Sequence, residues 1–532
     1  MNARALAVAT ALGTSLVGGG WVISRGLNVR EADFSSARLF DAVLGHIRQF
    51  YVDSIADSTL FEHATVGMLR ELNDPYTMYL PPNRLRRLTE QVTGNYFGIG
   101  AQIQRRDDYP MIIAPFPGSP AERAGLHTGD RVVEIDGVKT KGWMNDEVTK
   151  ALRGPPESEV TLVIERPGDP QRMTLKVKRS GVHRRAVGRT ALLARGVGYV
   201  DVNIFNDSTA RELRQAVDSL QAAGMRALIM DLRGNPGGVL TQGVGVADMF
   251  LDSAQLIVSM RGRGPGANEQ FRDATRQAWP NLPLVVLVDG GSASASEIVA
   301  GALQDHDRAL VMGRTTFGKG SAQGVFPAGT GGGVRITTAR WFTPAGRSID
   351  RPHRDPGIEE DAPVDSFRTE HGRKVAGGGG IEPDVQAGDT TLAPGDQALE
   401  DALGSRVIDF RDAMVDVAIA LRSRGAVRSR DFVVTPQMLD ELWVAMRGRG
   451  LRFPRSTFDG ASPLVSSLLA REIARFAFGT EAEAERAIAD DPVIQEAVRL
   501  AAEAKSPADL LARGKSEGTG TRHQASGSGS GR

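Results

Sequence analysis

"LPLVVLVDGGSASASEIVAGALQDHDRALVMG", residues 282–313, decides the fold of this chain. Its first part, Leu284–Val288, is an unbroken apolar run, which is typical of a strand buried on both faces. A glycine turn follows, and then apolar residues recur at helical spacing from Ile298 to Leu303. A second apolar run, "RALVMG", completes the unit. Strand, helix and strand in this order predict a layered α/β core.

The same alternation continues towards the N-terminus. Apolar runs "GVGYVDVNIF" and "ALIMDL" alternate with helical patterns near residues 210–222 and 244–250. We therefore place the core at residues 183–392, ending just after "GIEPDV". Within it, a polar insertion at about residues 354–376 is predicted to be a mobile surface loop.

The regions on either side of the core have different sequence patterns, so the chain is predicted to be a multidomain α/β protein. Residues 31–90 contain a helical hairpin, because apolar residues recur at helical spacing between Ala37 and Leu72. Residues 91–182 show short alternating runs and glycine turns, which indicate a β-rich module. Residues 393–513 contain roughly four helical runs. The polar stretch 514–532 is predicted to be a disordered tail.

Composition argues against several functions. Lysine plus arginine and aspartate plus glutamate each number 64, and no basic stripe is interleaved with aromatics, so no nucleic-acid partner is predicted. There is no cysteine, and the eight histidines show no metal-binding spacing, so neither a metal nor another cofactor is predicted.

The first thirty residues concern location. Residues 5–24 carry no charge and are long enough to cross a bilayer, which fits either a cleaved signal peptide or a membrane anchor. No small-x-small cleavage site follows, which favours the anchor. We expect an exported protein of the cell envelope, periplasmic or membrane-anchored outside the cytoplasm.

Lys319 lies in "GRTTFGKGS", residues 313–321, which has the look of a phosphate-binding loop. That motif needs serine or threonine directly after the lysine and then a helix. Here Gly320 follows the lysine, and strand-like sequence follows Gly320. A nucleotide site is therefore not predicted.

Ser294, at the strand-to-helix turn, allows two interpretations. Ser294-x-x-Glu297 fits a capping box that only satisfies helix amides. Alternatively, Ser294 is a nucleophile beside free amides, with Lys319 as its base. Such a lysine must be neutral, so its pKa must fall from roughly 10.4 towards 7 through desolvation or positive neighbours. The nearby Phe317 and Phe326 are compatible with burial.

Taken together, these motifs resemble the C-terminal processing peptidases, or tail-specific proteases, which are Ser/Lys-dyad serine proteases with a PDZ domain. The resemblance spans about residues 38–385. The motifs that carry it, in order, are "DPYTMYL", "YFGIG", "GSPAERAGLHTGDRVVEIDG", "DLRGNPGG", "SASASEIVAGALQD", "TFGKGSAQGVF", "WFTPAGRSI" and "GIEPDV". It implies a Clp/crotonase-like protease core.

The resemblance also implies roles for residues of the core. Ser294 would be the nucleophile, Lys319 the base and Gln323 the residue that holds the lysine amine. The amides of Ala295 and Gly237 would form the oxyanion hole. Asp305 matches an acidic position that we treat as supporting.

For the β-rich module, the resemblance implies a PDZ-like domain that binds protein or peptide substrates by their free C-termini. The carboxylate would be bound by the loop of Tyr96, Phe97, Gly98, Ile99 and Gly100. A catalytically inert PDZ-based peptide-binding scaffold is the alternative function. The helical C-terminal region could self-associate, dock an adaptor, cover the cleft or simply extend the packing.

Overall fold

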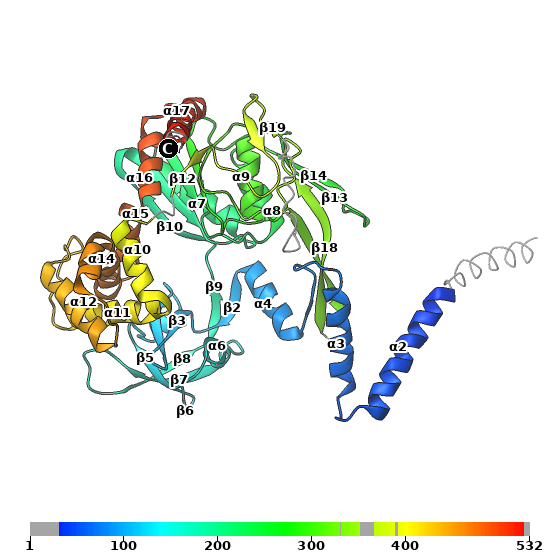
Figure 1. The fold of residues 1–532 in the computed structure, drawn as a ribbon, viewed down its shortest axis with the longest axis horizontal. Coiled ribbons are helices and arrows are strands. Elements are labelled where there is room, and N and C mark those ends of the chain that lie inside the picture. Colours follow the sequence, from blue (N-terminus) through cyan, green and yellow to red (C-terminus); the bar gives the residue numbers. More distant parts are fainter. Residues whose placement is uncertain (1–30, 330, 352–365, 389–391, 526–532) are drawn as a thin grey trace, which may run out of the picture. The chain divides into compact units, whose positions relative to one another are not determined.

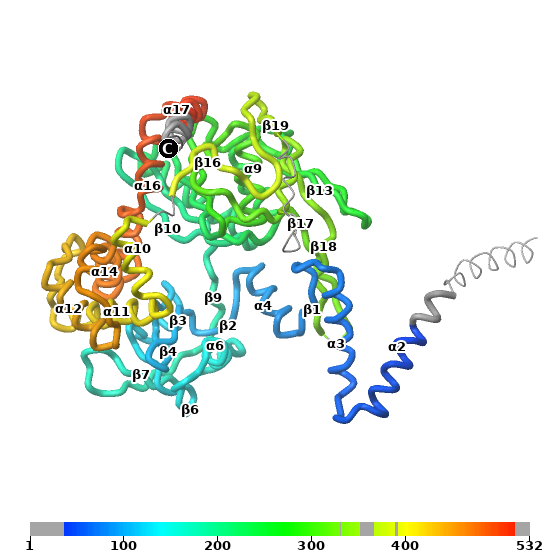
Figure 2. Tube along the Cα trace, in the orientation of Figure 1, coloured from blue at the N-terminus to red at the C-terminus, as the bar shows by residue number. Residues whose placement is uncertain are grey.

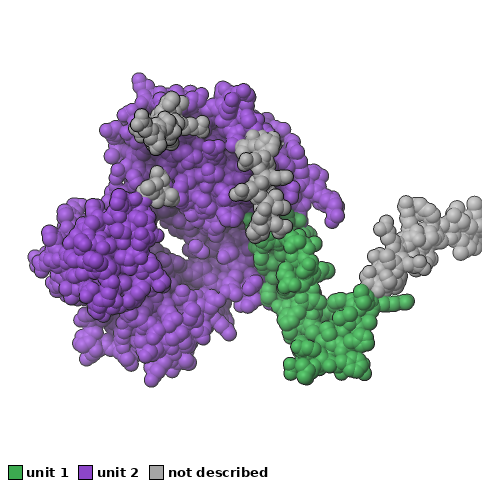
Figure 3. All heavy atoms as spheres, in the orientation of Figure 1, with its two compact units in different colours: residues 1–81, 325–337 green, residues 82–324, 338–532 purple. Residues whose placement is uncertain are grey.

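The computed structural model describes residues 31–329, 331–351, 366–388 and 392–525 (Figure 1). These fall into two compact units (Figure 3): residues up to 81 with 325–337, and residues 82–324 with 338 onwards. The membrane segment expected in residues 1–30 lies outside the described residues. Among the helices that are described, none combines the length and hydrophobicity needed to cross a bilayer.

The first unit contains the two N-terminal helices, α2 (Glu31–Phe50) and α3 (Asp57–Arg70), which confirms the predicted helical pair. Strand β1 (Met78–Leu80) follows and pairs antiparallel with residues 333–335 of β18 (Gly332–Phe342). The apolar positions that predicted the helices differ in burial: Leu39 is 67% and Met68 66% exposed, whereas Ile47, Leu60 and Ala64 are partly buried. The helical spacing therefore predicted the conformation correctly, but it did not mark a fully buried face.

The β-rich module in the second unit combines an antiparallel sheet, a separate pair of strands and short helices. Its sheet has the order β3-β4-β5-β7-β8, with β6 on β5, and a separate pair joins β2 to β9. Valine, leucine and isoleucine from the sheet pack on Val148 and Leu152 of α6, which closes one side of this core. The elements are α4 (Pro82–Thr93), β2 (Asn95–Gly98), β3 (Ala101–Arg106), β4 (Tyr109–Pro115), α5 (Pro120–Arg123), β5 (Arg131–Ile135), β6 (Val138–Lys139), α6 (Asn145–Leu152), β7 (Glu159–Glu165), β8 (Met173–Lys178) and β9 (Ser180–His183).

The α/β core is built on a six-stranded sheet of order β10-β11-β12-β15-β16-β21. Strand β10 is antiparallel to β11, and the other pairings are parallel. Every residue of β12 and β15 is buried, as their unbroken apolar runs predict. The strands are β10 (Val187–Leu192), β11 (Val197–Val202), β12 (Ala227–Asp231), β15 (Leu284–Val288), β16 (Leu310–Gly313) and β21 (Val385–Gln386).

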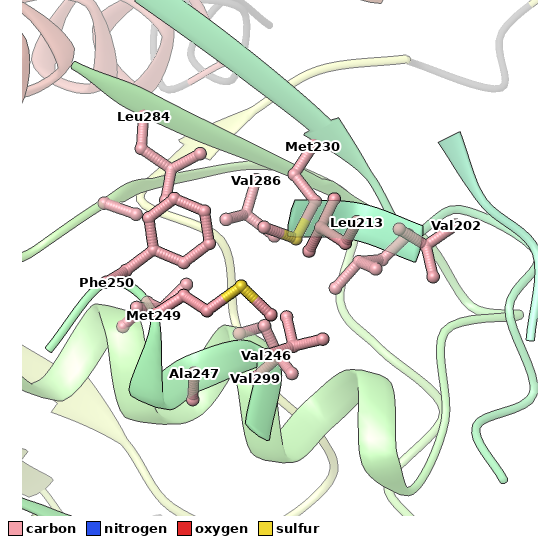
Figure 4. Packing of buried hydrophobic residues seen from close by; sticks show 14 of the residues in the cluster. Val202, Leu213, Met230, Val246, Ala247, Met249, Phe250, Leu284, Val286 and Val299 are labelled. Carbon is pink, nitrogen blue, oxygen red and sulfur yellow. The ribbon is translucent and has the colours of Figure 1, made fainter. Parts of the chain in front are cut away.

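Three helices cover one face of this sheet: α7 (Thr209–Ala222), α8 (Leu240–Asp248) and α9 (Ala295–Asp305). Alternate strand residues point to this side because side chains alternate across a strand. Met230 and Val286, from neighbouring strands, face Val246 of α8 and Val299 of α9 (Figure 4).

The opposite face is covered by helices from the far end of the chain, α16 (Pro492–Glu503) and α17 (Pro507–Ala525) (Figure 2). Ile494, Leu500 and Leu510 belong to one buried cluster with Ile229 and Leu287 of the sheet. Part of the C-terminal region is therefore the third layer of the core. The sequence predicted a disordered tail from residue 514 onwards. In the structure, α17 begins with buried residues and extends as a helix to Ala525, so the predicted start of the tail is wrong.

The rest of the C-terminal region forms a separate helical cluster. Phe410, Leu442 and Phe458 lie in its core, and Met111 and Ile113 of β4 pack into the same core. The described C-terminal region thus holds eight α-helices where the sequence indicated about four. The six before α16 are α10 (Pro394–Leu403), α11 (Val407–Ser423), α12 (Pro436–Gly448), α13 (Arg455–Gly460), α14 (Ser462–Phe478) and α15 (Thr480–Ala489).

The polar insertion differs from its prediction. Residues 352–365 lie outside the described residues, but 366–376 form a hairpin of β19 (Ser366–Arg368) and β20 (Lys374–Ala376). Arg373 binds Asp307, just after α9, and Asp384, just before β21. This half of the insertion is therefore fixed by largely buried ion pairs, which the polar composition alone did not indicate.

A second sheet carries the segment after Lys319. Strand β13 (Leu256–Gly262) pairs with β14 (Glu269–Arg272) and with β18, and β17 (Ser321–Ala328) pairs with β18. Lys319 is thus followed by strands and no helix, so the helix dipole that a phosphate loop requires is missing.

The third layer generates a stability prediction. Leu500 on α16 is 2% exposed, so Leu500→Ala leaves a cavity against the sheet and lowers the free energy of unfolding by about 2–5 kcal/mol. Val444→Ala on α12, where the side chain is 68% exposed, changes it by less than about 0.5 kcal/mol. Urea denaturation of the full chain measures both, and equal midpoints for the two variants would contradict the assignment of α16 to the core.

Candidate active site

Ser294 lies at the junction of β15 and α9 in a strained backbone conformation. Its φ is +54° and its ψ is −112°, outside the conformations that residues with a side chain normally adopt. Strain of this kind persists only where surrounding contacts impose it, and it is concentrated at functional sites. Ser294 is half-buried, and it lies in the turn between the end of β15 and the start of α9, at the edge of the sheet.

Gly237 lies directly against Ser294. A Cβ on Gly237 would be 2.8 Å from Ser294 Cβ, 2.8 Å from Ala295 N and 2.5 Å from Ala293 O, and the φ of Gly237 is +87°. Only glycine permits this approach. The structure thus brings together Ser294 and the two residues predicted to supply oxyanion donors.

The two predicted donor amides differ in their present partners. The amide of Ala295 donates to no acceptor within the described residues, as expected for the first residue of a helix. The amide of Gly237 donates to Asn235 Oδ1 at 2.9 Å.

Asn235 holds the Gly237 loop, and the sequence reading did not single it out. Its side chain is fully buried and donates to Val202 O at 2.6 Å. Its carbonyl accepts from Ala293 N at 3.0 Å and Ser296 Oγ at 2.9 Å. The asparagine therefore connects β11, the loop and the serine turn. Its position in the motif "DLRGNPGG" was the only feature of the sequence that pointed to a role for Asn235.

Glu297 joins the serine segment to the lysine segment. Its fully buried carboxylate accepts from Ser294 N at 2.7 Å, as a capping box predicts. The same oxygen accepts from Lys319 N at 3.0 Å. The other oxygen accepts from Gly318 N at 2.7 Å and Thr316 Oγ1 at 2.5 Å. One carboxylate thus holds together two segments that lie far apart in sequence.

Burial raises the pKa of the Glu297 carboxyl, while the four hydrogen bonds favour its charged form. Because all four partners are donors, the geometry fits an ionised carboxylate, which only accepts. The capping interpretation of this motif and the catalytic one are compatible, since a single side chain serves both.

Lys319 is half-buried, and the backbone on both sides of it is fixed. Gly318 O accepts from Arg351 N at 3.1 Å, and Gly320 N donates to Asp350 Oδ1 at 3.0 Å. A Cβ on Gly320 would lie 3.0 Å from Asp350, so a larger residue would be tightly packed here.

The two phenylalanines near Lys319 in sequence are less buried than the sequence suggested. Phe317 is 44% and Phe326 48% exposed, so neither is buried as a desolvating neighbour would be. Gln323 donates from Nε2 to Ser321 Oγ at 3.0 Å.

Asp305 and Arg347 form a buried ion pair, with the side chains 1% and 0% exposed. Asp305 Oδ2 also accepts from Ala345 N at 2.9 Å. The segment anchored in this way continues to Asp350 and Arg351, which bind the glycines on either side of Lys319. Asp305 therefore lies behind the lysine segment, and Arg347 is a partner that the sequence reading missed.

The loop predicted to bind a carboxylate is fixed at its carbonyls. Ile99 O accepts from Ala121 N at 2.7 Å and Gly100 O from Phe116 N at 2.9 Å. The amides of Ile99 and Gly100 donate to nothing in the part of the chain that is described. Phe97 is half-exposed, Ile99 is buried, and Tyr96 stacks on Arg153 with the guanidinium carbon 4.9 Å from the ring.

Clusters of titratable side chains elsewhere in the described residues could be alternative sites. Among the described residues, no three or more histidine, aspartate or glutamate side chains are grouped so as to hold a metal ion. Ser208, His183 and Glu212 do form a hydrogen-bonded cluster, but Ser208 is buried and donates to Glu212 at 2.7 Å. Glu212 also accepts from the amides of Ala186 and Val187, which fits a structural role.

Comparison with known proteins adds two family matches. The model of peptidase family S41 matches residues 196–364, which include Gly237, Ser294, Lys319 and Gln323. The PDZ domain model matches residues 112–166, which confirms the predicted PDZ domain without covering the loop of residues 96–100.

Similar proteins are found over about two thirds of the chain. A "Probable CtpA-like serine protease" of Staphylococcus aureus (strain COL) is 35% identical over 343 residues, 64% of this chain and 67% of the relative. A "Carboxy-terminal-processing protease" of Bartonella bacilliformis is 33% identical over 341 residues, 63% of this chain and 78% of the relative. The solved "photosystem II D1 C-terminal processing protease" is 31% identical, covering 66% of this chain and 88% of that one, with a TM-score of 0.37.

The shared carboxylate generates a prediction. Glu297→Gln turns one acceptor oxygen into a donor that faces backbone amides, so the free energy of unfolding falls by about 1–3 kcal/mol. Because the serine turn and the lysine segment lose their common anchor, labelling of Ser294 by a fluorophosphonate should slow at least about tenfold. Mass spectrometry of the labelled peptide measures the rate.

Glu212→Gln is the matched control, since Glu212 is also a buried glutamate that accepts from two backbone amides. We expect it to lose comparable stability and to keep the labelling rate of the parent. Equal slowing in both variants would mean that Glu297 acts only through general stability.

Proposed function

This chain belongs to peptidase family S41, and on that premise we propose that it cleaves protein substrates whose C-terminal tails it binds through its PDZ domain, using Ser294 and Lys319. It is a serine protease with a PDZ domain. The observation that carries the proposal is the shared anchor: Ser294 N and Lys319 N bind the same oxygen of Glu297.

In the proposed reaction, the neutral amine of Lys319 accepts the proton of Ser294 Oγ as that oxygen attacks the scissile carbonyl. The lysine then gives the proton to the departing amine, which leaves an acyl-enzyme on Ser294. Water, deprotonated by the same lysine, attacks the ester, and the proton returns to Ser294 Oγ. Gln323 orients the amine with its side-chain amide, which adds no charge.

Negative charge on the tetrahedral oxygen is balanced by the amides of Ala295 and Gly237. The free amide of Ala295 at the start of α9 supports the first donor. Gly237 donates to Asn235 Oδ1 in the described arrangement, so its use requires that this bond be shared or released.

For tail recognition, we assign the carboxylate to the loop of residues 96–100. Its amides at Ile99 and Gly100 are available, and its carbonyls are fixed by Ala121 N and Phe116 N, so the amides need no reorganisation to bind an anion. Phe97 is half-exposed and can contact the last apolar side chains of the tail.

The cellular location of the protein and its association with partners are predicted from the sequence alone. We propose that the uncharged stretch of residues 5–24 directs the chain to the cell envelope, outside the cytoplasm. Adaptor docking or self-association through the C-terminal region remains a prediction for the faces of that region that do not cover the core sheet.

Substitution of the dyad tests the proposal. Ser294→Ala should abolish cleavage of an unstructured reporter with an apolar C-terminus, and Lys319→Ala should lower kcat by about 10²–10⁴-fold, because each removes a reacting group. Both variants should bind the reporter's tail as the parent does, which fluorescence anisotropy measures. Cleavage by Ser294→Ala would end the mechanism, and tail binding without cleavage by the parent would favour the inert scaffold.

The lysine base also predicts a pH dependence. Because only the neutral amine accepts a proton, kcat/KM should rise with pH through the ionisation of Lys319 and then level off. A steady-state profile on the reporter measures it. A flat profile between about pH 5 and pH 9 would contradict Lys319 as the base.

A further inference from the structure

Asp491 lies at the start of α16, in the C-terminal region, and its two carboxylate oxygens have different partners. Oδ1 caps the helix, accepting from Val493 N at 2.9 Å and Ile494 N at 3.1 Å. Oδ2 is 2.9 Å from Nη1 of Arg233. One side chain therefore joins a helix of the third layer to the loop that follows β12.

Arg233 is the first anchor of that loop. Its Nε and Nη2 bind the carboxylate of Asp231, at 2.9 and 2.6 Å, and Asp231 also accepts from the hydroxyl of Tyr199 at 2.9 Å. The guanidinium thus has Asp231 on one edge and Asp491 on the other. Two carboxylates fix its plane, because an arginine presents its donors in a rigid fork.

Three residues separate Arg233 from Gly237, which lies beside Ser294. Within this stretch, Gly234 N donates to Asp289 Oδ1 at 2.8 Å, and Asn235 is held by Val202 and Ala293. Every other anchor of the loop lies in the catalytic core. The contact with Asp491 is the one described anchor that comes from the C-terminal region.

We infer that Asp491 is a positioning residue: α16 sets the place of the Gly237 loop, and with it the oxyanion donor, through Arg233. This inference rests on the proposed function. It makes part of the C-terminal region a component of the active site, beyond its role as a covering layer.

The burial of the residues directly after Asp491 supports this assignment. Val493 and Ile494, directly after it, are buried against the core sheet, so the carboxylate cannot shift without moving α16. The side chains of the ion pair are 22% and 24% exposed, and Arg233 keeps both of its bonds to Asp231 when Asp491 is replaced, so the loss of stability is expected to be small. The effect of the ion pair is therefore expected in the geometry of the loop and not in the melting temperature.

Asp491→Asn separates helix capping by this side chain from its ion pair with Arg233. Asparagine caps helices as well as aspartate does, so α16 keeps its first turn. The amide cannot offer Arg233 an anionic acceptor. We expect an unchanged melting temperature, an unchanged KM and about a tenfold lower kcat on the reporter, since small displacements of catalytic groups are costly.

A peptide aldehyde gives a readout that a merely structural role would not move. Its adduct with Ser294 places an oxyanion-like group at the donors, so its inhibition constant should rise by the same factor as kcat falls. Hydrogen exchange of the peptide spanning 232–239 should become faster in Asp491→Asn, and this measurement requires no cleavage activity.

Asp490→Asn is the matched control, because it removes the neighbouring carboxylate, which binds Ser467 Oγ at 2.6 Å and does not contact Arg233. It should behave as the parent in every assay. Exchange and aldehyde inhibition in Asp491→Asn equal to those of the parent would overturn the inference, as would an equal loss in Asp490→Asn. Failure of the proposed function shows separately, as absence of cleavage by the parent, and the exchange measurement still decides the role of Asp491.

Discussion

The proposed active site depends on one fully buried carboxylate, that of Glu297. Glu297 is held by three backbone amides and one hydroxyl, and two of those amides belong to Ser294 and Lys319. A buried charge is costly unless every lone pair is satisfied, so this arrangement is stable only when both segments are in place. The carboxylate therefore fixes the serine turn and the lysine segment relative to each other.

Around this anchor, each further segment is held by a buried polar contact. Asn235 fixes the glycine loop to the serine turn, and the pair of Asp305 and Arg347 fixes the segment behind Lys319. In the proposed mechanism these side chains do not carry out the chemistry. They limit the positions available to the groups that do, and such limitation is how a protein supplies orientation before a reaction begins.

The C-terminal region has two physical roles. Helices α16 and α17 bury the second face of the core sheet, and α10–α14 pack on strand β4 of the PDZ domain through Met111 and Ile113. Further contacts run from Arg106 to Asp416 and from Arg449 to Asp107. One continuous region of chain thus contacts both the substrate-binding domain and the catalytic core.

The sequence by itself determined the order of the domains, the strands and helices of the core, and the serine and lysine segments, because apolar periodicity and short motifs are local properties. It did not locate Arg347 or Asp491, and it misjudged residues 366–376, the end of α17 and the surroundings of Phe317 and Phe326. Those features depend on contacts between residues tens to hundreds of positions apart. Which face a helix covers and which carboxylate meets which amide are decided only when the layers pack, because burial and hydrogen-bond satisfaction are properties of the folded chain.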